Sequence, residues 1–241
     1  QITPDKLIID EGIKKDELNF MEIFTHSSNV GSINIVENLG VKKQKELFER
    51  LNINSQISLY GLNVVKNKLP KNWDSQASKS ISYGYGISIS PISLVTSYAA
   101  LVNGGYEIKP KVNQKENYSK KRILKDSTSK KINILLREIV KNGTGKKANV
   151  NGIKVGGKTG TSRKLENGKY SEKKVITSFI GAFPIDQPKY IAFILFDEPR
   201  RNKSESLESF GGNTAAPTFS RILKKISPIL NRSNYIKMNL K

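Results

Sequence analysis

The spacing of apolar residues changes near residue 150, and this change limits the folds open to the chain. Up to about residue 142 the apolar residues mostly recur with a helical period, as in the stripe Ile132, Leu135, Leu136, Ile139 and Val140. After residue 151 they form short strand-like runs instead. A chain of 241 residues with 37% hydrophobic residues is long enough to bury a core around both kinds of element.

Capping residues mark the ends of several predicted helices. Gly40 follows residues 30–39 and is predicted to end the helix there. Ser90 followed by Pro91 predicts a helix start, with the serine as N-cap and the proline as first helical residue. A last helix is predicted to begin near Pro217. The first part of the chain is therefore predicted to be mainly helical.

Three strands are predicted in the second part, at residues 153–161, 175–183 and 190–196. The reversal signal Asn167-Gly168 joins the first two, and the turn-rich PIDQPK joins the last two, so antiparallel neighbours are expected. Three strands are few for this length, and none is evident in the first thirty residues. Together with Gln1 in place of a methionine, this predicts a chain that begins in mid-domain.

The charge of the chain is strongly positive, with 41 Lys+Arg against 21 Asp+Glu and a net charge of +20. Such a field attracts nucleic acid, anionic lipid or acidic polymers. However, the sequence has no arginine cluster and no interleaving of aromatic and basic residues, so we interpret the lysines as solvated surface and predict no nucleic-acid partner. The chain has no cysteine, which excludes disulfides and thiolate metal sites.

The stretch GGKTGTS at residues 156–162 places Lys158 between glycines and hydroxyls. Gly152 and Gly157 give the spacing of a phosphate-binding loop. Such a loop requires a helix that starts at the lysine, and the residues that follow have no helical period. The sequence therefore disfavours a nucleotide site.

A site for the end of a peptide fits the same stretch better. A strand edge can pair with an extended peptide, and a lysine on that strand adds positive charge. The hydroxyls of Thr159 and Thr161 can hydrogen-bond a terminal carboxylate, and Gly160 lets the substrate backbone approach closely. By itself the Lys-Thr-Gly motif is a weak signal in a lysine-rich chain, so a partner motif is required.

Ser27-Ser28-Asn29 is the candidate partner motif, because a helical segment ends there. Ser27 and Asn29 could aim a hydroxyl and a carboxamide into one cleft. An ordinary helix cap explains these residue types as well. We predict that the motif and the Lys158 strand face each other across a single groove.

With both motifs placed, the chain resembles the transpeptidase domain of class B penicillin-binding proteins, especially the cell-division type that builds septal peptidoglycan. THSSNVGSINIVENLG resembles the S-x-N region of that family, and SISYGYGISISPISLVTSYAALVNGG its YGYG segment with the following helix. VGGKTGTS, FIGAFP and YIAFILFDEP resemble the K-T-G hairpin with its neighbouring strand, and FGGNTAAPTFSRILKKI the closing helix. The resemblance covers residues 19–230.

The resemblance implies an α/β (α+β) fold of the penicillin-binding/β-lactamase type, with an antiparallel sheet flanked by helices and a helical subdomain. The chain would be a partial domain whose N-terminal part is missing. Residues 1–150 would form the mainly helical part with the S-x-N motif. Residues 151–230 would form the hairpin strands and the closing helix, and residues 231–241 a tail.

The serine nucleophile and lysine base of the family belong to an S-x-x-K motif, and none precedes Ser27. Two copies follow it, at residues 127–130 and 171–174, both among charged residues. An activated serine needs a partly buried lysine nearby, so both copies are interpreted as accidental. We therefore expect the nucleophile and the general base to be absent from this chain, and the fragment alone to be inactive.

The resemblance assigns roles in a D,D-transpeptidase that attacks the D-Ala-D-Ala end of peptidoglycan stem peptides. Ser27 would relay a proton, Asn29 would hydrogen-bond the substrate amide or the catalytic lysine, and Lys158 would supply positive potential. Thr159 and Thr161 would hold the carboxylate, or its equivalent in a β-lactam inhibitor. The backbone at Thr161 would provide one donor of the oxyanion hole. No metal or organic cofactor is needed, and His26 has no role.

Three alternatives remain open at this point. One is a nucleic-acid binder, which only the positive charge suggests and which would show a salt-dependent affinity for DNA. A serine β-lactamase or D,D-carboxypeptidase would share the motifs, although the YGYG segment and the closing helix fit a transpeptidase better. A non-catalytic peptidoglycan-binding or scaffold protein would explain the missing nucleophile. For the transpeptidase, the resemblance implies the periplasmic face of the inner membrane, an anchoring transmembrane helix outside this chain, and a division or cell-wall synthesis complex as partner.

Overall fold

The computed structural model describes residues 2–3, 6–10, 13, 15, 17–59, 61–112, 121–166, 168–199 and 210–239. Only the backbone is described at residues 2–3, 6–7, 172–173 and 231–239. The chain forms two compact units, Gln1–Leu135 and Leu136–Lys241.

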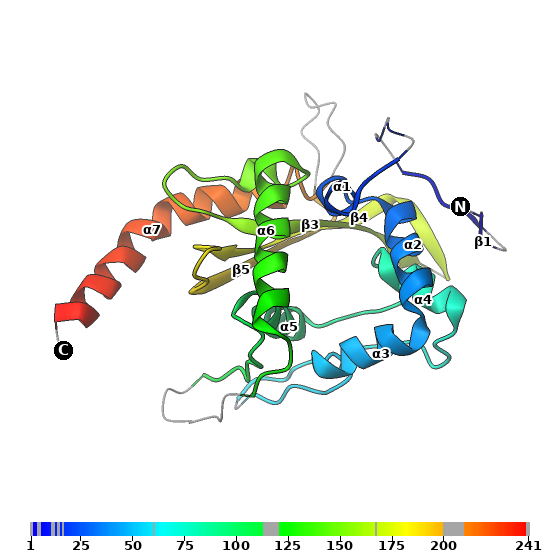
Figure 1. The fold of residues 1–241 in the computed structure, drawn as a ribbon, viewed down its shortest axis with the longest axis horizontal. Helices are drawn as coiled ribbons and strands as arrows, with labels where there is room; N and C mark the ends of the chain where they lie inside the picture. The colour runs from blue at the N-terminus through cyan, green and yellow to red at the C-terminus, as the bar shows by residue number, and fades with distance from the viewer. Residues whose placement is uncertain are drawn as a thin grey trace. The chain divides into compact units, whose positions relative to one another are not determined.

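The first unit is mainly helical, as predicted, and Figure 1 labels most of its elements. Its helices are α1 (Phe20–His26), α2 (Asn29–Leu39), α3 (Val41–Arg50), α4 (Ser75–Ser82), α5 (Pro91–Val102) and the first part of α6 (Asp126–Asn142). It also contains two antiparallel strands that the sequence analysis missed, β1 (Ile2–Thr3) and β2 (Lys6–Leu7). Two residues are too few to show an alternating pattern, so no sequence signal marks such strands.

The predicted helix ends in this unit are confirmed. Ser90 is the N-cap of α5, and its side chain accepts a hydrogen bond from the backbone N–H of Ser93; Pro91 is the first helical residue. Gly40, at a φ of 83°, ends α2. Asn19 begins α1 with a capping box, in which Asn19 and Glu22 bond each other's backbone N–H.

The interior of the first unit combines an apolar cluster with a buried polar contact. Leu51, Ile53 and Ala100 form the buried centre of the cluster. Gln44 of α3 is buried, and its amide donates to the backbone oxygen of Ser78 in α4 at 3.1 Å. Its carbonyl oxygen accepts from the Ser78 hydroxyl at 2.6 Å. Because both ends of this amide are paired, it joins the two helices without leaving a buried polar atom unsatisfied.

The second unit contains an antiparallel sheet and a long helix, which confirms the predicted architecture. The sheet has the order β3 (Gly156–Glu166), β4 (Lys169–Phe183) and β5 (Tyr190–Asp197). A short 3-10 helix, η1 (Lys146–Ala148), precedes it, and α7 (Ala215–Asn239) follows it. The turn between β3 and β4 contains Gly168 at a φ of 79°, which suits a tight reversal.

The β3–β4 hairpin extends well beyond the strands that the apolar runs predicted. Its outer part pairs without β5 and carries charged residues. Lys174 contacts Glu166 at 2.6 Å, and Lys164 contacts Asp197 at 2.9 Å. A strand with two solvated faces has no alternating hydrophobic pattern, so its length could not be derived from such a pattern. Strand β3 also begins later than predicted, because Val150 and Ile153 pair across a turn.

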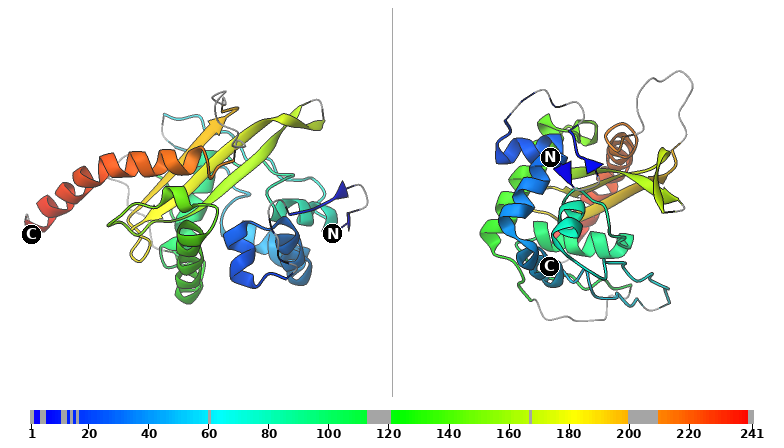
Figure 2. Two further views of the ribbon diagram at one scale, coloured as in Figure 1. Left: turned by 90° about the horizontal axis from the view of Figure 1, so that it is seen from above. Right: turned by 90° about the vertical axis from the view of Figure 1, so that its right-hand side faces the viewer.

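Helix α7 covers one face of this sheet, as Figure 2 shows, and the core of the second unit lies between them. The ring centroid of Phe219 on α7 lies 4.9 Å from that of Phe179 on β4 and 5.9 Å from that of Phe183. All three side chains are buried. The helix continues past Pro228 to Asn239, over most of the stretch predicted as a tail. The predicted domain boundaries at residues 150 and 230 stay a prediction.

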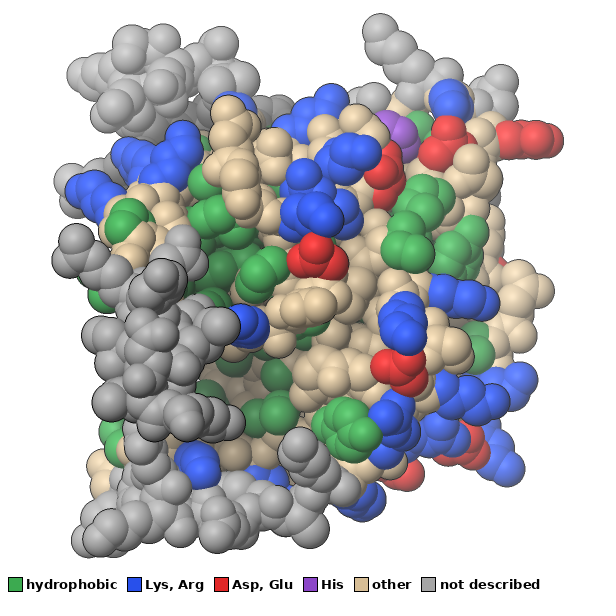
Figure 3. Space-filling model, turned by 60° about the vertical axis from the view of Figure 1, so that its left-hand side comes forward, with side chains coloured by type: hydrophobic (Ala, Val, Ile, Leu, Met, Phe, Trp, Pro, Cys, Tyr) green, Lys and Arg blue, Asp and Glu red, His purple; other side chains and the backbone are tan. Residues whose placement is uncertain are grey.

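The charged side chains are dispersed over the face of the molecule that Figure 3 draws, where acidic groups lie among the lysines and arginines. Several lysines form ion pairs, such as Lys79 with Glu37 at 2.6 Å.

None of the helices in the described residues combines the length and the apolar character needed to cross a bilayer.

Candidate functional site

The K-T-G motif lies on β3, at the border of the sheet in the second unit. In the register with β4, Thr159 lies opposite Phe179 and Thr161 opposite Thr177. Successive side chains of a strand point to opposite faces. Thr159 and Thr161 therefore share the face that carries Phe179 and α7, and Lys158 points to the other face.

Lys158 is a lysine of β3 whose pKa is lowered, whereas the pKa of Lys164 on the same strand is raised by its ion pairs. Its side chain is half-buried, and Nζ donates to the backbone oxygen of Thr159 at 3.1 Å. Burial lowers the pKa of the Lys158 ammonium from 10.5 to about 8. The group is therefore still mostly protonated at neutral pH, and it loses its charge under mildly alkaline conditions. A poorly solvated cation acts more strongly on a nearby anion than an exposed lysine does.

The two threonine hydroxyls on the opposite face are held by neighbouring loops. The Thr159 hydroxyl lies 2.8 Å from that of Thr144, and either can be the donor. The Thr161 hydroxyl oxygen accepts from the backbone N–H of Gly211 at 3.0 Å. Because that bond uses a lone pair of Thr161, its hydroxyl hydrogen can still be donated to a carboxylate.

The loop at residues 210–214 packs directly on β3 and β4, a contact that no sequence pattern predicted. A Cβ atom at Gly211 would lie 2.4 Å from the backbone oxygen of Ser178 and 2.5 Å from that of Gly160. The Thr214 hydroxyl donates to the hydroxyl of buried Thr177 at 2.8 Å. The paired glycines in FGGNT were the available signal, since glycine marks close approach of two backbones.

Gly160 has a structural reason to be glycine, in addition to its predicted role in substrate approach. A Cβ atom at this position would lie 2.5 Å from Oγ of Ser178, its partner on β4. A side chain at Gly160 would therefore require the Ser178 hydroxyl to move, whether or not a substrate is bound. Its proposed contact with a substrate backbone stays a prediction.

The S-x-N motif lies at the junction of α1 and α2 in the first unit. Ser27 follows α1 in the left-handed conformation, with φ 58° and ψ 45°, and its side chain is exposed. Ser28 is 1% exposed and is the N-cap of α2, accepting from Gly31 N at 2.8 Å. Asn29 is the first residue of α2 and is half-buried. The motif thus divides into a buried cap, Ser28, and two flanking polar residues that are accessible.

The conformation of Ser27 is unusual for a residue other than glycine. A left-handed conformation costs about 1–2 kcal/mol in such residues and occurs often at functional sites. Its backbone N–H bonds back to the last turn of α1, which holds the reversal between the two helices. His26 beside it is exposed, and the absence of a role for it stays a prediction.

Neither S-x-x-K copy provides a buried lysine. Lys130, on α6, pairs with Asp126 at 2.8 Å, and its side chain is 75% exposed. Lys174, on the outer hairpin, pairs with Glu166, and this ion pair raises the pKa of Lys174. A lysine that activates a serine needs a lowered pKa. The interpretation of both copies as accidental stays a prediction.

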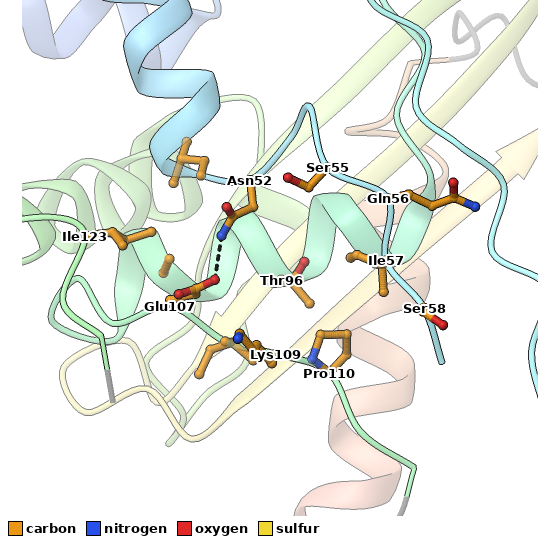
Figure 4. Close-up of a pocket in the computed structure, with 13 residues that line it drawn as sticks. Asn52, Ser55, Gln56, Ile57, Ser58, Thr96, Glu107, Lys109, Pro110 and Ile123 are labelled. Atoms are coloured by element: carbon orange, nitrogen blue, oxygen red, sulfur yellow. Dashed lines mark hydrogen bonds between the residues drawn. The ribbon is translucent and has the colours of Figure 1, made fainter. Parts of the chain in front are cut away.

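The first unit also contains a cavity of about 340 Å³, drawn in Figure 4, in which Asn52 donates to Glu107 at 2.7 Å. Residues after α3, on α5 and around Lys109 line it. None of the predicted site residues is among these lining residues.

In the described part of the chain, no group of three or more His, Cys, Asp or Glu residues could hold a metal ion.

Ser27 and Asn29 belong to the first unit, and Lys158, Thr159, Gly160 and Thr161 belong to the second. The structure brings the members of each motif together within their own unit. The predicted meeting of the two motifs across one groove stays a prediction.

Comparisons with known proteins agree on one family. The family model described as the penicillin-binding protein transpeptidase domain matches residues 5–224. A probable peptidoglycan D,D-transpeptidase FtsI of Caulobacter vibrioides is 33% identical over 238 residues, which are 93% of this chain and 40% of that protein. Stage V sporulation protein D of Bacillus subtilis is 30% identical over 236 residues, covering 90% of this chain and 36% of that protein.

Solved structures match as well. The transpeptidase domain of Burkholderia pseudomallei penicillin-binding protein 3 matches with a TM-score of 0.77 and 27% identity, over 88% of this chain and 64% of that one. Penicillin-binding protein 3 of Mycobacterium tuberculosis, solved in complex with aztreonam, shares the fold with a TM-score of 0.76 and 22% identity, over 88% of this chain and 51% of that one. The chain spans about 40% of the length of its curated relatives.

Proposed function

We propose that this chain, which belongs to the penicillin-binding protein transpeptidase family, forms the substrate-binding part of a peptidoglycan D,D-transpeptidase. The proposed substrate is a stem peptide that ends in D-Ala-D-Ala. The proposed product is the cross-link between two stem peptides in the cell wall or the division septum.

The proposed reaction has two acyl-transfer steps. A serine Oγ attacks the carbonyl carbon of the D-Ala-D-Ala bond, the C–N bond breaks, and the leaving amine of D-alanine takes up a proton. The amine of a neighbouring stem peptide then attacks the resulting ester, forms the new amide and returns the hydroxyl to the serine. The nucleophile and its lysine base come from outside residues 1–241, since no S-x-x-K motif precedes Ser27.

The arrangement on β3 is the observation that carries this proposal. Thr159 and Thr161 project from the same face of the strand, so both hydroxyls can reach one terminal carboxylate. Lys158 projects from the other face of the strand, so its half-buried ammonium is proposed to act through its positive potential and not through a direct contact with the carboxylate. The backbone N–H at Thr161 is the proposed donor to the oxyanion of the tetrahedral intermediate. A β-lactam carries a comparable carboxylate and would bind the same groups as an inhibitor.

Ser27 and Asn29 take the roles that depend on contact with the leaving group and the substrate amide. The exposed Ser27 hydroxyl relays a proton towards the leaving amine, and the Asn29 carboxamide hydrogen-bonds the substrate. Both roles require the motif to face the β3 border. We further propose that the full-length protein acts at the periplasmic face of the inner membrane, held by a transmembrane helix outside this chain, within a cell-wall or division complex.

Covalent labelling of the full-length protein with a fluorescent penicillin tests the function. We expect labelling of the wild type, and a loss of about 100-fold in labelling rate for Lys158→Ala, because this variant removes the positive potential that attracts the carboxylate. Lys154→Ala is the matched control, since Lys154 is exposed and pairs with Asp186 at 2.9 Å. Equal rates in the Lys158→Ala variant and the wild type would contradict the assignment of Lys158.

The products separate the alternative activities. Incubation with two stem peptides, one bearing an acceptor amine, yields a cross-linked dimer from a transpeptidase, whereas a D,D-carboxypeptidase releases D-alanine without cross-linking. Hydrolysis of the penicillin with rapid turnover would indicate a β-lactamase. A protein that binds stem peptides without any covalent labelling would instead be a binding or scaffold protein.

A further inference from the structure

The junction between α1 and α2 is held by a carboxylate from far upstream in the sequence. We propose that Asp10 is a positioning residue for the S-x-N motif, an inference that rests on the function proposed above. Asp10 lies 18 residues before Ser28 and 19 before Asn29. It belongs to none of the motifs by which the site was predicted.

The carboxylate of Asp10 contacts three successive residues at the start of α2. Oδ1 accepts from the backbone N–H of Asn29 at 2.6 Å and from that of Val30 at 3.2 Å. Oδ2 accepts from the hydroxyl of Ser28. Asp10 and Asn29 are both half-buried, so these bonds are partly shielded from water.

These contacts complete the capping of α2. The first N–H groups of a helix have no partner within the helix and need an acceptor from elsewhere. Ser28 supplies one for Gly31, and Asp10 supplies one for each of Asn29 and Val30. The first turn of α2 contains no acidic residue, so Asp10 provides the negative charge that the positive end of the helix dipole favours.

The same contacts hold Asn29 directly, and they hold Ser27 through its neighbour Ser28. Ser27 and Asn29 flank Ser28, whose hydroxyl Asp10 binds, and the backbone of Asn29 is bound as well. Removing the carboxylate therefore frees the start of α2 and changes the direction of the Asn29 carboxamide relative to the Ser27 hydroxyl. Displacements of about 1 Å in such a site reduce rates by up to about 100-fold.

The test compares Asp10 with an aspartate that caps a different helix. Asp74 is the N-cap of α4 and accepts from the backbone N–H of Ala77 at 2.8 Å. We would prepare Asp10→Ala, Asp10→Asn, Asp10→Glu and Asp74→Ala in the full-length protein. The second-order rate of acylation by a fluorescent penicillin and the melting temperature are measured for each.

We expect Asp10→Ala to lower the acylation rate about 10- to 100-fold at a temperature well below its melting point. Asp74→Ala loses a cap of the same kind but keeps the acylation rate of the wild type. Asp10→Asn recovers to within about threefold, because its carboxamide oxygen can still accept from Asn29 and Val30. Asp10→Glu stays about 10-fold slow, because the longer side chain displaces the carboxylate from these donors.

A double-mutant cycle with Asn29→Ala provides a readout that a merely structural role would not move. If Asp10 acts through Asn29, Asp10→Ala changes the rate only slightly in the Asn29→Ala background. Equal rate losses in both backgrounds would overturn the inference, and so would equal losses in Asp10→Ala and Asp74→Ala. If Asp10→Ala does not fold, a wild-type rate in Asp10→Glu overturns it. Absence of acylation in the wild type would instead refute the proposed function.

Discussion

The S-x-N junction and the K-T-G strand are built by different means. The junction relies on side chains: Ser28 and Asp10 supply oxygen atoms to the backbone N–H groups of α2. The strand relies on backbone packed against backbone, where Gly211 leaves no room for a Cβ atom between it and Gly160. The difference teaches that the two motifs should tolerate substitution differently. A cap can be replaced by another acceptor, whereas a close backbone approach allows glycine alone.

The largest effect is expected where the loop at residues 210–214 meets the sheet. Gly211→Ala places a Cβ atom within 2.4–2.5 Å of two backbone oxygens, those of Ser178 and Gly160. Since neither backbone can move without disturbing the sheet, we expect a loss of about 2–4 kcal/mol in the free energy of unfolding. Urea denaturation measures it.

Gly160→Ala tests whether a side-chain obstacle costs less than a backbone obstacle. Its new Cβ atom would lie 2.5 Å from the side-chain oxygen of Ser178. We expect Ser178→Ala to restore most of the stability lost in Gly160→Ala and none of that lost in Gly211→Ala. Recovery of both variants, or of neither, would show that side-chain and backbone obstacles do not differ as proposed.

The next effect concerns Lys158 and depends on pH. The folded chain holds the Lys158 ammonium at a pKa of about 8, below its ordinary 10.5, so between these values the unfolded chain binds more protons. The free energy of unfolding of the wild type therefore increases with pH between about 8 and 10.5. Lys158→Met removes the buried charge, and we expect it to be more stable than the wild type by up to about 3 kcal/mol at pH 7.

The difference between Lys158→Met and the wild type should narrow as the pH is raised towards 10.5, because the wild-type lysine then becomes neutral. Chemical denaturation at pH 7 and pH 10 checks this, since the other titrating groups are common to both proteins. A difference that does not change with pH would contradict the proposed desolvation. Increased stability together with lost penicillin labelling would mean that function keeps this lysine in place.

The smallest effect is expected at the S-x-N junction. Ser28→Ala removes the buried N-cap of α2, and we expect it to lower the free energy of unfolding by about 1 kcal/mol. Ser27→Ala leaves that cap intact, and its stability should stay within about 0.5 kcal/mol of the wild type. Acylation should respond in the opposite order, with the greater loss in Ser27→Ala. A matching order in both measurements would mean that Ser27 is only structural.

Much of the fold could be predicted because its signals are local. The stripe from Ile132 to Val140, the pair Ser90-Pro91 and the runs at residues 175–183 and 190–196 each report their own element within a few residues. The candidate residues could be named because serine, asparagine, lysine and threonine occur in short motifs. The outer hairpin and the two-residue strands near the N-terminus were missed, because neither produces an apolar pattern.

Sequence by itself determined which residues carry polar chemistry and on which elements they lie, since hydrogen-bonding capacity, charge and backbone preference are properties of a residue and its close neighbours. Only the tertiary structure decided that Asp10 caps α2, that Gly211 packs on Gly160 and that Lys158 is desolvated. Each of these contacts joins or buries groups through segments distant in the chain. These contacts depend on the tertiary fold of each unit, so no local sequence pattern predicts them.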